Sequence, residues 1–358
     1  MSVLHHRRQF LIYGSAAFAT SLLLKACASN STSTSNTPST TPSSSDAKKL
    51  KVAVALPGII TDKAWNQVGY EGVKAIEKKL GVETAYVENV AQADQVEVLS
   101  DFARRGYNLI YAHGGQFDAA IRQVAPQFFP DTYFVGVNGT VSGKNMASLR
   151  IDHLQASYIC GIIGAAMTKS NKMAYLAAQS FQATNEELRG FQLGAKSVKP
   201  NIQIVPSYTG DWNDAAKAKE ATLALISSGV DVIYQWLDNA SPAVLQTAAE
   251  KGIYAFGNTT DQLDLAPKAV LTSAVKRIDL AIAYLAELAN KGNLEGKIYT
   301  LGFEQPDILY FGKFGAMVSK DVEQKAIQTK ESILAKKIMF ESCQENGQYT
   351  RCLKLGNG

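Results

Sequence analysis

Short apolar runs and helical segments alternate along this chain, and the alternation begins again near residue 170. Runs such as 51–56 and 172–177 are apolar after their first residue, and a segment with helical spacing of apolar residues follows each run. Strands that alternate with helices are the signature of parallel βαβ units. The chain therefore predicts an α/β protein with two Rossmann-like halves.

The boundaries of the predicted elements come from the same patterns. Strands are predicted over 51–56, 83–87, 109–112, 133–137, 172–177, 202–205, 230–235, 254–257, 270–273 and 297–301. Helices are predicted over 63–80, 92–105, 117–128, 153–167, 185–198, 214–227, 241–251, 277–290 and 320–336.

These elements group into two lobes. The first lobe is predicted to contain residues 48–150 with about 275–302, and the second 151–274 with about 303–340. Residues 341–358 form a tail with a possible hairpin. Two lobes joined by a chain that crosses back late are typical of a clamshell, which holds a ligand in its cleft and closes by a hinge motion.

The first 26 residues have the composition of an export signal. Arg7 and Arg8 precede an apolar run over 12–24, which is too short for a comfortable membrane span. The paired arginines resemble the twin-arginine type of signal, with ordinary export as the alternative. Leu-Lys-Ala-Cys at 24–27 resembles a bacterial lipobox, which implies that Cys27 carries a lipid; otherwise it is an ordinary thiol beyond a plain signal.

Residues 27–47 would then link a lipid to the folded body. Ser, Thr, Asn and Pro dominate this segment, so we expect a disordered tether that holds the body off a membrane. The expected location is the plasma membrane, lipid-anchored and facing the periplasm or the cell exterior.

The formal charge of +4 overstates the basic character of the mature chain. Beyond residue 26 there are 33 basic and 32 acidic side chains, with no long basic run. Nucleic-acid binding therefore has no electrostatic support.

The remaining cysteines and the histidines predict no metal site. Cys160 lies in an apolar helical stretch and reads as a core residue. Cys343 and Cys352 flank a turn signal, so they either form a disulfide in an oxidising compartment or remain unpaired thiols. The four histidines are scattered along the chain, which argues against a metal cluster.

All three tryptophans follow predicted strands. Trp65, Trp212 and Trp236 lie in or at the start of the loops that leave those strands. Ligands bind at the carboxyl ends of strands in open parallel sheets, and an indole offers a flat face for stacking. We therefore expect a flat, aromatic ligand, although each indole alone is also explained by core packing.

Several polar residues follow predicted strands and are candidate ligand contacts with structural alternatives. Asp62 and Asp214 can accept hydrogen bonds from N–H groups of a ligand, or they can act as N-caps of the helices that follow them. Asp238 either contacts the ligand or belongs to the ordinary helix start before Ser241-Pro242, and Asn258 either contacts the ligand or forms a turn. Gly114 allows close approach of the backbone or simply makes a turn. Lys276 follows the end of a predicted strand near the lobe crossover, and it either contacts the ligand or is an exposed lysine.

Ordered motifs resemble the basic membrane protein family of bacterial lipoproteins. The opening Asp62-Lys63-Ala64-Trp65-Asn66-Gln67 with Tyr70-Glu71-Gly72 is similar to the family's D-x-x-[FW]-N-x-x-x-Y-E-G pattern, and further similar stretches surround 189–196, 229–233 and 271–277. The resemblance implies a type I periplasmic-binding-protein fold, a lipid anchor and a nucleoside-type ligand. It also implies that Trp65 stacks on the base, that Asp62 and Asn66 flank it, and that Lys276 reaches a ribose hydroxyl.

One segment departs from the family pattern. Residues 257–262 resemble a stretch that usually reads Gly-Val-Asp-x-Asp-Gln, but Thr259 replaces the first Asp, which is suited to gripping a ribose diol. Trp212-Asn213-Asp214 and Asp238 match a subset of the family that looks suited to free purine bases. Nucleoside and nucleobase therefore both remain open.

The leading interpretation is a receptor that delivers a purine nucleoside or nucleobase to the permease of an ABC importer. The alternative is a receptor of the same fold coupled to a membrane signalling partner. An enzyme is not expected, because Pro57-Gly58-Ile59-Ile60-Thr61 after the first strand is no phosphate loop and no Ser-His-Asp order appears. We expect a monomer without a cofactor.

Overall fold

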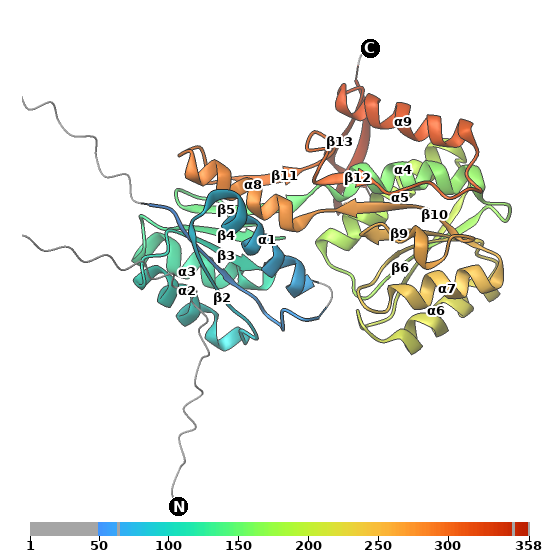
Figure 1. The fold of residues 1–358 in the computed structure, drawn as a ribbon. Coiled ribbons are helices and arrows are strands. Elements are labelled where there is room, and N and C mark those ends of the chain that lie inside the picture. Colours follow the sequence, from blue (N-terminus) through green and yellow to red (C-terminus); the bar gives the residue numbers. More distant parts are fainter. Residues whose placement is uncertain (1–48, 63–64, 346–347, 357–358) are drawn as a thin grey trace, which may run out of the picture.

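The computed structural model describes residues 49–62, 65–345 and 348–356. Its two six-stranded sheets form two lobes (Figure 1). Lobe 1 contains β1 (Lys51–Ala55), β2 (Glu83–Val87), β3 (Leu109–His113), β4 (Tyr133–Val137), β5 (Met146–Ile151) and β11 (Ile298–Leu301). Lobe 2 contains β6 (Lys172–Ala177), β7 (Gln203–Tyr208), β8 (Val232–Trp236), β9 (Tyr254–Thr259), β10 (Val270–Lys276) and β12 (Leu309–Phe311).

The two sheets have the same internal order. Lobe 1 runs β11-β5-β4-β3-β1-β2, and lobe 2 runs β12-β10-β9-β8-β6-β7. Every pairing within them is parallel except that of β12 with β10. Strands β3, β8 and β10 are buried along their whole length, because helices cover both faces of a parallel sheet. The predicted α/β architecture with two Rossmann-like lobes is confirmed.

Helices pack on the sheets in pairs. They are α1 (Trp65–Leu80), α2 (Gln95–Arg104), α3 (Asp118–Phe128), α4 (His153–Met167), α5 (Gln182–Val198), α6 (Ala215–Ser227), α7 (Ser241–Lys251), α8 (Ile278–Asn290) and α9 (Lys320–Leu334). One apolar core lies under α2 and α3, another under α6 and α7. The largest core runs through both lobes and includes residues of α1, α8, α4 and α5.

The chain passes between the lobes after β5, after β10 and after β11. The second crossing brings α8 back against α1 of lobe 1, and β11 then pairs with β5 at the edge of the sheet. Three connections between two lobes are the basis for a hinge in a clamshell.

Two strands were absent from the sequence prediction. In β5, Ser148 and Arg150 interrupt the apolar run, but the Ser148 hydroxyl donates to the Val141 carbonyl at 2.8 Å and is fully buried. Strand β12 has only three residues and is held in the sheet by antiparallel pairing with β10. Neither strand carries the long β-branched run on which the prediction depended.

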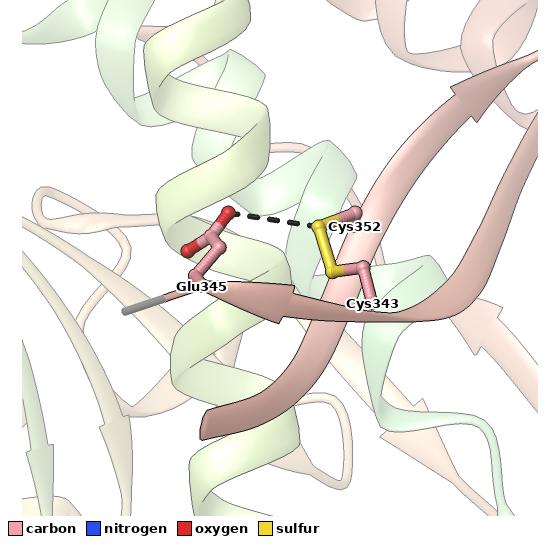
Figure 2. Close-up of side chains that lie close together, drawn as sticks. All are labelled: Cys343, Glu345 and Cys352. Carbon is pink, nitrogen blue, oxygen red and sulfur yellow. Dashed lines mark hydrogen bonds between the residues drawn. A yellow bond between two sulfur atoms is a disulfide. The ribbon is translucent and has the colours of Figure 1, made fainter. Parts of the chain in front are cut away.

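The tail forms a hairpin of β13 (Ile338–Glu345) and β14 (Gln348–Leu355). A disulfide joins Cys343 to Cys352 across the two strands, and the Glu345 carboxylate lies 3.6 Å from the Cys352 sulfur (Figure 2). Sulfurs held in a disulfide are not thiolates, so this Cys-Glu-Cys group is not a metal site. The Arg189 guanidinium donates to Glu345 and to the Arg351 carbonyl, which ties α5 to the hairpin.

The predicted export signal, Cys27 and the predicted tether lie outside the described residues, as do Asn346 and Gly347. Within the part that is described, no helix combines the length and apolar character needed to span a bilayer.

Candidate functional site

A cavity of about 600 Å³ lies between the lobes. Lobe 1 lines it from the start of α1 and the loops after β3 and β4, and lobe 2 from the loops after β6 and β7 and the end of β8. This is the carboxyl rim of both parallel sheets, where ligands bind in such folds. Seven of the predicted ligand-binding residues line the cavity: Asp62, Trp65, Asn66, Gly114, Trp212, Trp236 and Asp238.

Asp62 shapes the loop on the lobe 1 side. Its carboxylate accepts hydrogen bonds from the backbone N–H groups of Asn66 at 2.9 Å and Gln67 at 3.0 Å, as a helix N-cap does. The Asn66 side chain in turn accepts from the Gly58 N–H. Capping of α1 and a position on the cavity wall are therefore compatible roles for the same carboxylate.

Trp65 is held by the buried ring of His113. The two rings stack with centroids 4.0 Å apart, and His113 Nε2 lies 2.8 Å from the Trp65 carbonyl oxygen. Burial lowers the pKa of His113 to about 4, so the ring is neutral and Nε2–H donates to the carbonyl. This contact fixes one indole face and leaves Trp65 in position on the cavity wall.

Gly114 follows β3 with φ of +135°, a region that residues with a side chain rarely adopt. A Cβ at this position would lie 2.2 Å from the Gln116 side chain. The glycine therefore lets the chain turn directly at the cavity, so that Gly115 and Gln116 also line it.

The lobe 2 wall is an aromatic cluster. The ring of Trp212 meets that of Trp236 edge-on at 6.4 Å, and Phe181 lies 5.9 Å from Trp212 and 6.3 Å from Trp236. Trp236 is 8% exposed, so this indole is largely packed in place. The three rings present an apolar, rigid surface opposite Trp65.

Lys276 does not line the cavity, contrary to the prediction. Its ammonium group lies 3.9 Å from the centre of the Trp236 ring and pairs with Glu187 at 2.5 Å. Both side chains are buried, with 1% and 0% exposed surface. Lys276 is the last residue of β10 and its side chain turns into the interior, where it supports Trp236 from behind.

Glu187 is the centre of this buried network. Its carboxylate accepts from the hydroxyls of Tyr175 at 3.1 Å and Tyr234 at 2.5 Å, from the Asn258 amide at 3.2 Å and from Lys276. A buried carboxylate is tolerated when several donors and a cation surround it. Asn258 is thereby directed to Glu187 and also does not line the cavity, which corrects its predicted role.

Asp214 is likewise outside the cavity lining. Its side chain accepts from the N–H groups of Ala216 and Lys217, both at 3.0 Å, and caps α6. The capping alternative accounts for this residue, because the carboxylate is directed at the first turn of the helix.

Two carboxylates from opposite lobes line the same cavity. Burial, followed by the negative charge of Asp62, raises the pKa of Asp238 to about 6. Of the residues that the structure describes, no Lys or Arg lines this cavity. The walls therefore favour ligands that donate hydrogen bonds and oppose ligands with negative charge.

The raised pKa of Asp238 predicts a pH-dependent stability for the ligand-free protein. A carboxyl with a higher pKa in the folded state stabilises the fold at low pH, and this contribution is lost as pH rises through about 6. Asp238→Asn is therefore expected to raise the free energy of unfolding by about 1–2 kcal/mol at pH 7.5 and to leave it unchanged near pH 4.

Urea unfolding at the two pH values measures this effect. Asp131→Asn, at an exposed position, is the matched control and should change stability at neither pH. An Asp238→Asn variant no more stable than the parent at pH 7.5 would contradict the electrostatic origin.

Besides Gly115, which adjoins the predicted Gly114, five residues that sequence reasoning missed line the cavity: Gln116, Asn138, Gln179, Phe181 and Asn213. Most follow a strand of a parallel sheet within a few residues, as Asn138 follows β4 and Gln179 follows β6. Their position at the carboxyl rim was therefore a usable signal, but the prediction gave weight to tryptophans and carboxylates.

A direct contact joins the lobes at this cavity. The Asn239 side-chain amide donates to the Asp62 carbonyl at 2.8 Å and to the Asn213 side chain at 2.9 Å. The lobes are thus close enough in this structure for hydrogen bonds across the cleft.

Comparison with known proteins places this architecture among binding proteins. The family model described as ABC transporter substrate-binding protein PnrA-like matches residues 49–344. A solved structure of ABC transporter solute-binding proteins from Aeropyrum pernix superposes with a TM-score of 0.70 at 19% identity, covering 83% of this chain and 94% of that one. At this identity the likeness shows the shared type I periplasmic-binding-protein fold alone.

Two curated relatives are similar in sequence. A transcriptional activator protein from Bacillus subtilis is 32% identical over 276 residues, which are 77% of this chain and 86% of the relative. A purine-binding protein from Brucella abortus is 33% identical over 232 residues, 64% of this chain and 65% of the relative.

Proposed function

We propose, because this chain belongs to the family of PnrA-like ABC transporter substrate-binding proteins, that it delivers a purine nucleobase or nucleoside to an ABC importer. The observation that carries the proposal is the interlobe cavity with aromatic rings from both lobes, Trp65 on one side and Trp212 and Trp236 on the other. The family consists of substrate-binding proteins rather than enzymes.

A planar ligand suits the aromatic walls. Stacking of a base on an aromatic side chain contributes about 1–3 kcal/mol per base. The polar groups on the walls then decide which base is bound, because an unmade hydrogen bond in a closed site costs about 1–3 kcal/mol. Asp62, Asp238 and Asn138 are the polar side chains best placed for this selection.

The charge of the cavity argues for an unphosphorylated ligand. Asp62 and Asp238 would repel a phosphate group, and no cation lines the described part of the cavity to offset them. The contact of Lys276 with Glu187 also occupies the side chain expected to reach a ribose hydroxyl, which favours a free base over a nucleoside.

Calorimetric titration of the purified chain with a panel of ligands tests the proposal. Adenine, guanine, hypoxanthine, adenosine and guanosine represent the proposed class, and glucose and a mixture of amino acids serve as controls. We expect saturable binding of at least one purine, and binding of AMP at least about 100-fold weaker than that of the better of adenine and adenosine. The absence of a response to every purine, or AMP as the tightest ligand, would refute the ligand class.

The anchor and the partner are further parts of the proposal. Lipidation of Cys27 would hold the protein at the outer face of the plasma membrane, where the permease subunits of the importer are its partners. Mass spectrometry of the membrane fraction should find an acylated Cys27 at the mature N-terminus. A soluble mature chain with an unmodified start would rule the anchor out.

The name of the Bacillus subtilis relative describes a transcriptional activator, but that activity is not carried over to this chain. Beyond residue 26, basic and acidic side chains number 33 and 32, and DNA binding depends on a basic surface. The cavity, in contrast, has the walls of a small-molecule site.

A further inference from the structure

A second cavity, of about 560 Å³, lies away from the interlobe site and shares no lining residue with it. Strands β5 and β11 of lobe 1, helix α5 of lobe 2 and the C-terminal hairpin all contribute to its walls. A molecule bound there would contact three separate parts of the fold.

Three arginines from three different elements line this cavity. Arg150 comes from β5, Arg189 from α5 and Arg351 from β14. The acidic residues of the lining are Asp152 and Glu186, so the arginines outnumber the carboxylates. Guanidinium groups bind carboxylates and phosphates through paired N–H donors, which makes such a cluster suited to anions.

Two of the arginines already have carboxylate partners. Arg150 pairs with Glu186 at 2.8 Å, and Arg189 pairs with Glu345 at 2.5 Å. Their charges are therefore largely compensated within the protein.

Arg351 has no such partner. Among the described residues none forms an ion pair with its guanidinium, and its Nε–H is buried without a hydrogen-bond acceptor. A buried donor without an acceptor costs about 1–3 kcal/mol, which a ligand oxygen would recover. Asp152 on the wall accepts from the Leu154 and Gln155 N–H groups as the cap of α4; burial raises the pKa of its carboxyl to about 6, and the positive charge of Arg351 opposes that rise.

Hydroxyl groups complete the wall. Thr300, Ser342 and Thr350 line the cavity together with the amide side chains of Gln182 and Asn185. Hydroxyls and amides donate to further oxygens of a carboxylate or phosphate group. We propose that this cavity binds a small anion that presents a carboxylate or phosphate group to Arg351.

Titration calorimetry on the full chain, at constant ionic strength, tests this site. The probes are inorganic phosphate and acetate, which separate the two sources of the anionic group. We expect saturable binding of at least one probe, and a rise in melting temperature at saturating concentrations, since a ligand of the native state stabilises it. Saturation by acetate alone identifies a carboxylate site, and saturation by phosphate identifies a phosphate site.

Arg351→Gln should weaken this binding by at least about 10-fold, because it removes the guanidinium whose Nε–H has no acceptor. Arg351→Lys keeps the charge but loses the planar donor pair, so an intermediate loss is expected, and it replaces the Gln variant if that one fails to fold. Arg122→Gln, at an exposed arginine of α3 away from the cavity, is the matched control and should bind as the parent does. A parent chain that saturates with neither probe, or Arg351 variants that bind as tightly as the control, would overturn the assignment.

Discussion

Replacement of Glu187 by alanine is expected to lower the free energy of unfolding by about 3–5 kcal/mol, the cost of leaving a buried charge without its partner. The ammonium group of Lys276 has 1% exposed surface and would lose its only carboxylate contact among the described residues. The hydroxyls of Tyr175 and Tyr234 and the Asn258 amide would lose an acceptor as well. Urea unfolding at pH 7 measures the effect.

A double variant separates charge from packing. Glu187→Met combined with Lys276→Met removes both charges and retains most of the volume, so it should recover much of the lost stability. The control is Glu97→Ala, which breaks an exposed ion pair with Arg104 whose side chains are 75% and 50% exposed, and its loss should be about 1 kcal/mol or less. If the double variant is as unstable as Glu187→Ala, packing rather than charge pairing is the cause.

Trp65→Ala is expected to weaken purine binding by about 10–100-fold, which corresponds to the loss of one stacking face. His113 braces one face of the indole, and the cavity lies beside it, so the ring is already oriented before a ligand arrives. A preorganised ring loses little conformational entropy on binding, and its truncation therefore appears in the affinity. Calorimetric titration with the tightest purine of the panel gives the change.

Trp65→Phe should retain most of the affinity, because it keeps an aromatic face at the same position. Phe128→Ala, at a 60% exposed ring of α3 outside the cavity, is the matched control and should bind like the parent. Unchanged purine affinity in Trp65→Ala would exclude a stacking role for Trp65. Any stacking would then come from the aromatic rings of lobe 2.

The fold was largely predictable because its elements are locally encoded. Runs such as 52–56 are apolar over their whole length, as expected of strands buried on both faces. Strand β5 was missed because Ser148 is polar and yet buried, with a carbonyl partner that the local sequence does not reveal. Strand β12 was missed because three residues are too few to establish a period.

The site was predictable only in part. Trp65, Trp212 and Trp236 line the cavity because Trp236 ends a strand and the other two lie in segments that follow the carboxyl ends of strands. Phe181 belongs to the same cluster but was overlooked, although it stands four residues after β6. The burial of Glu187 was not predicted, because a carboxylate is normally exposed. The sequence offered one indication of it: Glu187 lies on the same helical face as Ala183, Gly190 and Phe191.

The sequence by itself determined the two parallel sheets, the rim at which their strands end, and the presence of Asp62 as a residue suited to cap the first helix. These features depend on residues close together in the chain, where periodicity and capping act. Only the tertiary structure decided that Lys276 pairs with Glu187 and does not line the cavity, because Lys276 and Glu187 are 89 positions apart in the sequence. Which polar groups meet in the protein interior depends on how segments that are distant in the sequence pack together. The residues near one position in the sequence do not specify that packing.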